Sequence, residues 1–206
     1  MRAVIISGGR IEDYDYIKKQ IELFGAELII CADSGYNHAE KMKLAVNTTV
    51  GDFDSLGRIP DGIKIIRYPV EKDCTDTEIA LSHARDAGAC DFLFIGATGT
   101  RADHTLTNIF MLKNCLSRGE NAQITDDNNK IRITETKLKL QGEKGTLVSI
   151  VPLCDCFGVT THGLKYPLQN ARLEFGGGLG VSNVMDKEDA DISVDEGTLL
   201  IIEARD

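Results

Sequence analysis

Three aspartates in two short motifs supply the side chains best suited to chemistry in this sequence. Asp52 and Asp54 lie in Val-Gly-Asp-Phe-Asp-Ser, and Asp76 lies in Lys-Asp-Cys-Thr-Asp-Thr-Glu. Residues i and i+2 of an extended backbone point the same way, so Asp52 and Asp54 can share one face. Clustered carboxylates repel one another unless a cation compensates their charge. The pattern therefore predicts a hard divalent ion, Mg²⁺, held jointly with nucleotide phosphates.

A purely structural interpretation of these motifs stays open. An isolated Asp-x-Asp pair is also typical of a solvated turn. Thr75 and Glu78 fit a capping box that would serve only the following helix, and the helix dipole alone would favour Asp76 in the first turn. The metal interpretation gains from two further strand ends that carry polar clusters of the same kind.

These two clusters follow apolar runs that are typical of buried parallel strands. The run 28–32 stops abruptly at Asp33, and the run 91–95 leads into a Gly-Ala-Thr-Gly-Thr turn with Arg101 and Asp103 behind it. Parallel sheets present their ligand-binding residues at the carboxyl ends of the strands. We therefore expect these side chains to meet the three aspartates at one edge of a sheet.

Helical patterns alternate with the strands in the first half of the chain. Between the first two strands a stripe at helical spacing is closed by a glycine that suits a helix C-terminus: Tyr14, Ile17, Ile21, Phe24 and Gly25. Alternating strands and helices predict βα units around a parallel sheet.

The hydrophobic pattern of the sequence changes near residue 119. Short alternating runs follow, at 130–133, 137–140, 147–151, 191–194 and 199–202, and turn signals separate them. Evenly spaced short strands indicate an antiparallel sandwich or barrel. We therefore predict an α/β domain over residues 1–120 and an all-β domain over residues 121–206.

Composition narrows the class of protein. The chain has 206 residues, 42% of them hydrophobic, which is enough for two ordinary cores. A net charge of −9 argues against nucleic acid as a partner, and no stretch approaches the roughly 20 apolar residues of a membrane span. Six scattered cysteines suggest free thiols in a reducing cytoplasm, and Cys154 with Cys156 would form only half of a metal site.

Familiar nucleotide-binding signatures are missing. The P-loop pattern Gly-x-x-x-x-Gly-Lys-Ser/Thr does not occur, which excludes that class of enzyme. The turn 96–100 is a weaker candidate, because backbone N–H groups at the start of a helix can cradle phosphate.

Taken together, the motifs resemble the thiamine pyrophosphokinase family. Cys-Ala-Asp-Ser-Gly at 31–35, Gly-Asp-Phe-Asp-Ser at 51–55, Lys-Asp-x-Thr-Asp at 72–76 and Gly-Ala-Thr-Gly-x-Arg-x-Asp-His at 96–104 occur in the family's order. Gly-Leu-Lys-Tyr-Pro-Leu at 163–168 and the pair Ser182-Asn183 resemble its thiamine-binding segment. Thr100 is a departure, since the family usually has a second glycine there.

The resemblance implies a Rossmann-like parallel-sheet domain followed by an antiparallel β-sandwich. It also implies a thiamine diphosphokinase that transfers the pyrophosphoryl group of ATP to thiamine with Mg²⁺, giving thiamine diphosphate and AMP. A homodimer is implied, with each active site between the α/β domain of one subunit and the β domain of the other. Two alternatives stay open: a pterin-alcohol pyrophosphokinase, and a catalytically silent nucleotide- or thiamine-binding module.

The resemblance also gives each candidate side chain a role. Mg²⁺ is assigned to Asp54 and Asp76, with Asp52 supporting them directly or through water. Asp33 and Asp103 are expected to organise the phosphates and the substrate. The residues expected to contact the ATP phosphates are Lys72, Thr98, Gly99 and Arg101.

Thiamine is a flat, cationic, two-ring alcohol, and three residues of the β half suit it. Tyr166 would offer its ring face to the cation, and Ser182 and Asn183 would hydrogen-bond the aminopyrimidine edge. Without the resemblance, Tyr166 is equally typical of a half-buried strand, and Ser182-Asn183 of a turn.

Overall fold

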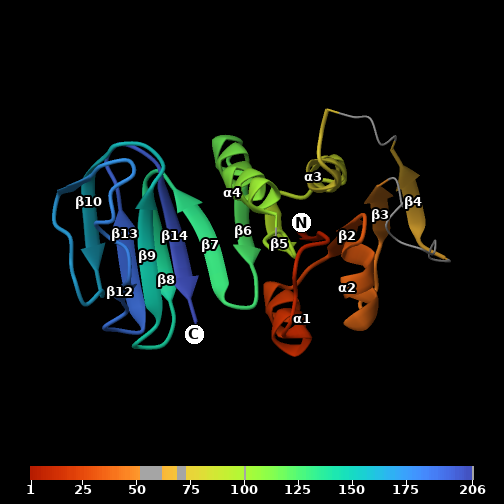
Figure 1. The fold of residues 1–206 in the computed structure, drawn as a ribbon, viewed down its shortest axis with the longest axis horizontal. Coiled ribbons are helices and arrows are strands. Elements are labelled where there is room, and N and C mark those ends of the chain that lie inside the picture. Colours follow the sequence, from red (N-terminus) through yellow and green to blue (C-terminus); the bar gives the residue numbers. More distant parts are fainter. Residues whose placement is uncertain (52–61, 69–72, 100, 206) are drawn as a thin grey trace. The chain divides into compact units, whose positions relative to one another are not determined.

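The chain forms two compact units in the computed structural model, Met1–Asp127 and Asn128–Asp206. The structure describes residues 1–51, 62–68, 73–99 and 101–205 (Figure 1). Each unit has a hydrophobic cluster of its own, so each is described by itself.

A parallel sheet organises the first unit. Its strands, in the described part of the chain, are β1 (Arg2–Ile6), β2 (Leu28–Ala32), β3 (Thr48–Gly51), β4 (Lys64–Arg67), β5 (Asp91–Ile95) and β6 (Asn121–Thr125). They lie in the order β6-β5-β1-β2-β3-β4, and every neighbouring pair is parallel. Although β6 lies beyond residue 120, its parallel pairing with β5 makes it part of this sheet.

Helices cover both faces of the sheet. They are α1 (Tyr14–Phe24), α2 (Gly35–Lys41), α3 (Asp76–Asp86) and α4 (Ala102–Ser117). Val4 and Ile6 of β1 pack in one cluster with Ile17 of α1 and Ala39 of α2. Successive residues of a strand point to opposite faces, so the equally buried Ile5 faces the other side, where α3 packs against β1, β2 and β3.

The order of the strands contains a switch point. The chain builds β1 to β4 in one direction and then returns to place β5 on the other side of β1. Open α/β sheets bind their ligands in the crevice at such a point, outside the carboxyl ends of the strands. The predicted Rossmann-like sheet is confirmed, and its ligand-binding edge lies beyond β1 and β5.

The second unit is an antiparallel sandwich, as predicted. Its strands are β7 (Asn129–Thr134), β8 (Lys137–Gln141), β9 (Leu147–Pro152), β10 (Cys156–His162), β11 (Ala171–Leu173), β12 (Asn183–Val184), β13 (Asp189–Ser193) and β14 (Leu199–Ala204). They form the sheets β12-β9-β14-β7 and β11-β10-β13-β8. Fully buried Leu140, Ile150, Ile192 and Ile201 contribute to the core of this unit.

Helix termini in the first unit follow the local sequence. Asp13 accepts a hydrogen bond from the backbone N–H of Tyr16 at the start of α1, and Gly25 ends that helix with φ 69°. Thr75 and Glu78 form a reciprocal capping box at the start of α3. The predicted helix 14–24 and the predicted capping box are both confirmed.

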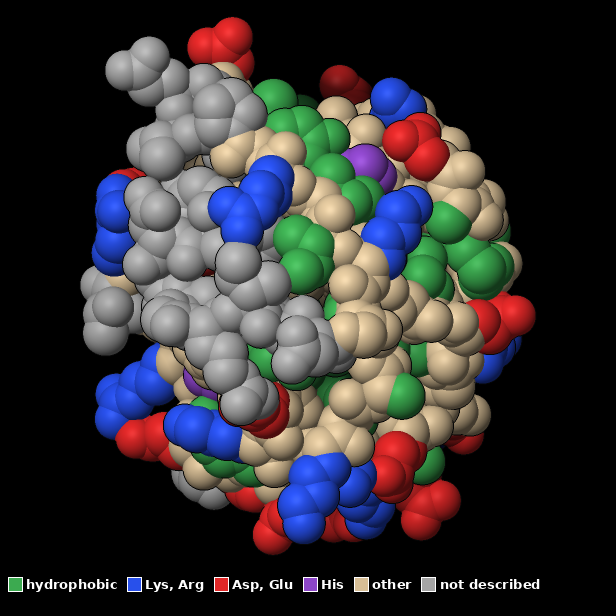
Figure 2. Space-filling model, turned by 90° about the vertical axis from the view of Figure 1, so that its right-hand side faces the viewer, with side chains coloured by type: hydrophobic (Ala, Val, Ile, Leu, Met, Phe, Trp, Pro, Cys, Tyr) green, Lys and Arg blue, Asp and Glu red, His purple; other side chains and the backbone are tan. Residues whose placement is uncertain are grey.

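The surface and the cysteines fit an ordinary globular chain. On the end of the first unit shown in Figure 2, Lys and Arg side chains are interspersed with Asp and Glu side chains. Among the described residues, no helix is long and apolar enough to cross a membrane. All six cysteines are free, and Cys31, Cys115 and Cys156 are buried.

Thr75→Ala tests the capping box. Loss of the hydroxyl leaves the backbone N–H of Glu78 without its acceptor, and we expect the free energy of unfolding to fall by about 1 kcal/mol. Chemical denaturation measures this change. Thr107→Ala, at an exposed position inside α4, is the matched control and should not destabilise the protein, since alanine favours helix interiors. Equal destabilisation by both variants would contradict the role of the cap.

Candidate active site

A cavity of about 300 Å³ lies at the switch point of the parallel sheet. The segments 7–9, 32–34, 75–77 and 96–99 line it, together with residues at the start of α4. These segments follow β1, β2 and β5 or begin α3 and α4. The polar strand ends that the sequence singles out at Asp33 and at 96–99 are therefore brought together with Asp76.

The turns after β1 and β5 are joined backbone to backbone. The N–H groups of Ser7, Gly9 and Arg10 donate to the carbonyls of Ile95, Gly96 and Thr98, over 2.8, 2.7 and 3.2 Å.

This contact is too close for side chains. A Cβ atom on Gly9 would lie 2.1 Å from the Thr98 carbonyl oxygen, and one on Gly96 would lie 2.3 Å from the Ser7 carbonyl oxygen. Gly96 also has φ 61°, which other residues adopt with strain. The floor of the cavity is therefore made of main-chain atoms.

Asp33 occupies an unusual backbone conformation. It follows β2 directly, is half-buried and has φ 47°, in the left-handed region that aspartate tolerates better than most residues. Its N–H donates to the carbonyl of Val50 over 2.7 Å, and a Cβ atom on Gly51 would lie only 3.2 Å from its Cα. The end of β3, where the Asp52-x-Asp54 motif begins, is therefore fixed beside Asp33.

Asp76 is the first residue of α3 and lines the cavity, half-buried. Its neighbour Thr77 is buried and shares a hydrogen bond of 2.8 Å between its hydroxyl and that of Ser7. This bond ties the start of α3 to the turn after β1. The backbone N–H groups in the first turn of a helix attract anions, and here they open onto the same cavity as Asp33.

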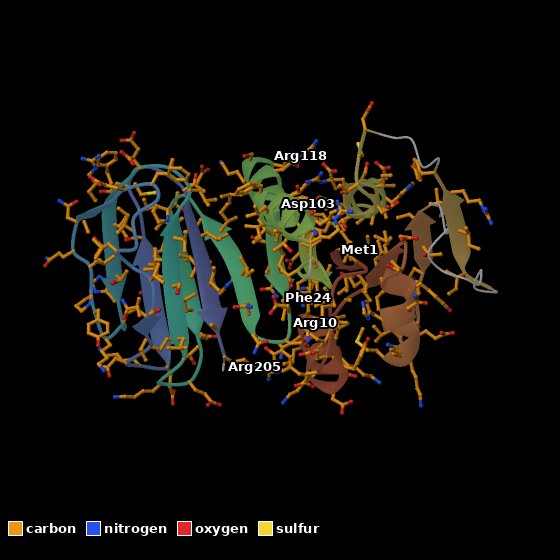
Figure 3. All side chains as sticks on the ribbon, in the orientation of Figure 1. Met1, Arg10, Phe24, Asp103, Arg118 and Arg205 are labelled. Carbon is orange, nitrogen blue, oxygen red and sulfur yellow. The ribbon has the colours of Figure 1, made fainter. Side chains whose placement is uncertain are left out.

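Arg101 precedes α4 and pairs with Asp103. Asp103 is labelled in Figure 3, in the first turn of α4. Its Nε donates to Oδ1 over 3.2 Å, and its Nη2 donates to Oδ2 over 2.5 Å. The hydrogen bond from Arg101, with the backbone N–H of His104, lowers the pKa of the Asp103 carboxyl to about 2. Arg101 lines the cavity, and its charge is compensated by Asp103.

The turn at 96–99 is held by hydrogen bonds to three side chains, those of Thr105, Asn108 and Asp126. Thr98 donates its hydroxyl proton to Asp126 over 2.8 Å, and the N–H of Gly99 donates to the hydroxyl of Thr105 over 3.2 Å. Buried Asn108 donates from Nδ2 to the carbonyl of Ala97 over 2.7 Å. Thr98 and Gly99, the two residues of this turn expected to contact phosphate, are therefore held in a fixed conformation.

The three candidates in the second unit lie on its surface or just beneath it. Tyr166 is 59% exposed, whereas Asn183 is buried, and its side chain bonds the backbone N–H and carbonyl of Tyr166 over 3.1 and 2.7 Å. Exposed Ser182 has φ 59°, and its N–H donates to the hydroxyl of Ser149. Asn183 is engaged with the backbone, while the ring of Tyr166 and the hydroxyl of Ser182 face solvent.

Four positions named by the sequence lie outside the described residues: Asp52, Asp54, Lys72 and Thr100. Within the described ranges, no group of three or more Asp, Glu, His or Cys side chains is placed to hold a metal ion. Asp33 and Asp76 do line one cavity together, and their carboxylate oxygens are the hard donors that Mg²⁺ requires.

Several lining residues escaped the sequence analysis. Ser7 and Gly9 follow a strand just as Asp33 does, but they carry no charge that marks a site. Asn108 had a usable signal, because it is a polar residue on the buried side of α4 beside Met111 and Leu112. A buried amide on an apolar face usually has a specific partner.

Comparison with known families decides what the two units are. Residues 21–124 match the family "Thiamin pyrophosphokinase, catalytic domain", and residues 129–199 match "Thiamin pyrophosphokinase, vitamin B1 binding domain". The chain belongs to the thiamin pyrophosphokinase family. The resemblance drawn from the motifs is confirmed, and the two matches fall in the two structural units.

Individual relatives agree with the family. The chain is 31% identical over 166 residues to a thiamine pyrophosphokinase of Bacillus subtilis, covering 76% of this chain and 77% of that one. It is 27% identical over 218 residues to thiamine pyrophosphokinase 2 of Arabidopsis thaliana, covering 86% and 78%. The crystal structure of the Bacillus subtilis protein superposes with a TM-score of 0.87, at 25% identity over all of both chains. That of Candida albicans shares the fold, with a TM-score of 0.79 at 17% identity, covering 99% of this chain and 90% of that one.

Asn108→Leu tests the brace beneath the turn at 96–99. The substitution keeps the volume but leaves the Ala97 carbonyl without its donor, at a cost of about 1–3 kcal/mol. We expect the KM for ATP to rise about tenfold in steady-state kinetics, because part of this cost falls on the turn that faces the nucleotide. Asn114→Leu, on the exposed side of the same helix, should leave this KM unchanged. Equal KM values for ATP in the two variants would contradict the assignment.

Proposed function

We propose that this chain transfers the pyrophosphoryl group of ATP to the hydroxyl of thiamine, forming thiamine diphosphate and AMP. The observation that carries the proposal is that one chain matches both the catalytic and the vitamin B1-binding families, in that order. The cavity at the switch point of the first unit supports it as a nucleotide site. The B1-binding match speaks against the pterin alternative, and the acidic cavity speaks against a silent binding module.

The phosphates of ATP are best placed over the turns after β1 and β5. Backbone N–H groups at the start of α3 are the donors there, Arg101 is the cation, and Thr98 and Gly99 form the turn that faces the phosphates. We assign Lys72 to the same phosphates. Arg101 would exchange Asp103 for a phosphate, because a guanidinium binds either anion with two hydrogen bonds.

Asp52, Asp54 and Asp76 are the proposed ligands of Mg²⁺, and Asp33 would orient the phosphates through bound water. The fit rests on Asp33 and Asp76, which supply oxygen donors to one cavity. When bound, the ion would neutralise charge that develops on the phosphate oxygens. In its absence these carboxylates would repel the triphosphate.

Pyrophosphoryl transfer requires the acceptor oxygen to attack the β-phosphorus of ATP. A bond forms between the thiamine oxygen and the β-phosphorus, and the bond from the β-phosphorus to the α–β bridging oxygen breaks. AMP leaves with that electron pair, and the alcohol proton passes to one of the aspartates. Arg101 and Lys72 would hold the two phosphates that move together, since such reactions depend on positioning and charge neutralisation.

Thiamine is assigned to the second unit. The exposed ring of Tyr166 would stack on the cationic acceptor, and the hydroxyl of Ser182 would bond its aminopyrimidine edge. Asn183 would hold the backbone of Tyr166 in place. A direct hydrogen bond from Asn183 to the pyrimidine is the role that the family resemblance implies. We further propose a cytoplasmic homodimer in which one subunit's first unit and its partner's second unit complete each site.

Removal of metal tests the carboxylate assignment. EDTA should abolish turnover and Mg²⁺ should restore it, and Asp76→Asn should lower kcat by about 10²-fold or more. Asp54→Asn should behave alike. Asp86→Asn, at the other end of α3, is a matched control that should retain normal turnover. Near-normal kcat in the Asp76 variant would remove that residue from the metal site.

The identity of the leaving nucleotide tests the reaction itself. Incubation with thiamine, ATP and Mg²⁺, followed by chromatographic separation, should give thiamine diphosphate and AMP in equal amounts. Thiamine monophosphate should not accumulate first, because both phosphates transfer in one step. Stoichiometric ADP would show attack at the γ-phosphorus and overturn the proposal. Turnover of a pterin alcohol in place of thiamine would favour the alternative acceptor.

A further inference from the structure

A chain of hydrogen bonds runs from the surface of the first unit to the turn after β1. Nζ of Lys41 donates to the hydroxyl oxygen of Tyr14 over 3.2 Å, and that hydroxyl lies 2.8 Å from Nδ1 of His38. Nε2 of His38 lies 2.7 Å from the carbonyl oxygen of Gly9. The chain thus connects α1 and α2 to a residue that lines the cavity.

Chemistry fixes the direction of every bond in this chain. A carbonyl oxygen only accepts, so Nε2 of His38 must carry a proton and donate it to Gly9. In a neutral imidazole Nδ1 is then an acceptor, and the hydroxyl of Tyr14 must donate to it. The ammonium of Lys41 only donates, which leaves the oxygen of Tyr14 as its acceptor. All the donors therefore point toward Gly9, and such aligned bonds strengthen one another.

The surroundings of His38 favour the neutral ring that this arrangement needs. Burial lowers the pKa of His38 below its usual value, and the positive charge of Lys41 lowers it further. The Gly9 carbonyl and the carboxylate of Asp127 act in the opposite direction, but they do not prevail. The ring thus stays neutral at neutral pH, with its one proton on Nε2.

The bond from His38 completes the fixation of one peptide group. The peptide between Gly9 and Arg10 is held at its carbonyl by His38 and at its N–H by the carbonyl of Thr98, 3.2 Å away. Rotation about this peptide would break both bonds and move the backbone that faces Thr98. His38 itself does not line the cavity, so any effect of it on a ligand passes through Gly9.

We propose that His38, oriented by Tyr14, is a positioning residue that holds the Gly9 peptide in the conformation required for binding the phosphates of ATP. The inference rests on the proposed function for the identity of the ligand. It concerns the nucleotide site alone, so the affinity for thiamine should not depend on it.

Paired substitutions distinguish the effect of the hydrogen bond that Nε2 donates from the effect of the space that the ring fills. The amide nitrogen of glutamine reaches the position of Nε2, whereas that of asparagine stops near Nδ1. We expect His38→Asn to raise the KM for ATP about fivefold or more, because one ordinary hydrogen bond is lost. The KM for thiamine should be unchanged. His38→Gln should restore most of the affinity for ATP. Asn37→Gln, exposed on the same helix, should leave both constants unchanged.

The orienting role of Tyr14 has its own readout in ¹⁵N NMR of the histidine rings. The chain has four histidines, and the His38→Gln spectrum assigns the signal that disappears. The native protein should show one tautomer of His38, protonated at Nε2. Tyr14→Phe should give a mixture of tautomers and a smaller rise in the KM for ATP. A merely structural role of His38 would lower the stability of the His38→Asn and Tyr14→Phe variants without raising their KM for ATP.

Different results would overturn the role of His38 and the proposed function. Equal effects of His38→Asn and His38→Gln on ATP binding, or a native ring protonated at Nδ1, would overturn the role of His38. Calorimetric titration with ATP and Mg²⁺ measures that binding whether or not the chain turns over thiamine. Absence of thiamine diphosphate from the wild-type reaction would overturn the proposed function and leave the tautomer result intact.

Discussion

The close approach of the turns after β1 and β5 is the constraint on which the nucleotide site depends. Backbone N–H groups of the first turn bond carbonyls of the second, and the distance between them leaves no space for a Cβ atom on Gly9. The remaining parts of the cavity are attached to this double turn. Ser7 bonds Thr77 of α3, and Asn108 of α4 bonds Ala97. Two helix N-termini therefore meet a floor whose conformation is already fixed.

This rigid floor explains how an acidic chain can bind a polyanion. The net charge of −9 repels phosphate at long range, so binding depends on local donors. In the proposed site, N–H groups at helix starts and Arg101 would provide these donors, while Asp76 would hold the cation and Asp33 would act through bound water; all line the cavity or begin a helix at it. On this proposal, donors and carboxylates around one small cavity would together suit a metal–nucleotide complex, whose own charges they complement.

Much of this arrangement follows from local sequence, and the rest depends on contacts across the fold. The stripe that is closed by Gly25 predicted helix α1 and its C-terminal cap, because helix periodicity and a glycine cap are local properties. The positions of Asp33 and Asp76 at one sheet edge followed from the parallel topology. The bond between Ser7 and Thr77 joins residues 70 positions apart, and no local pattern encodes it. Strand β10 also escaped prediction, since its burial does not alternate regularly.

A floor built from main chain also affects how such a protein can diverge. Side chains can drift one at a time, but Gly9 and Gly96 press against each other's neighbours, so neither position admits a bulkier residue by itself. Any variant that keeps this contact must keep both glycines, so the two turns can change only together. Substitutions are then easier at the rim of the cavity and on the sandwich, where an exposed residue such as Tyr166 can be replaced without a change in the backbone. The fold thereby separates an element that tolerates few substitutions from a surface that tolerates many.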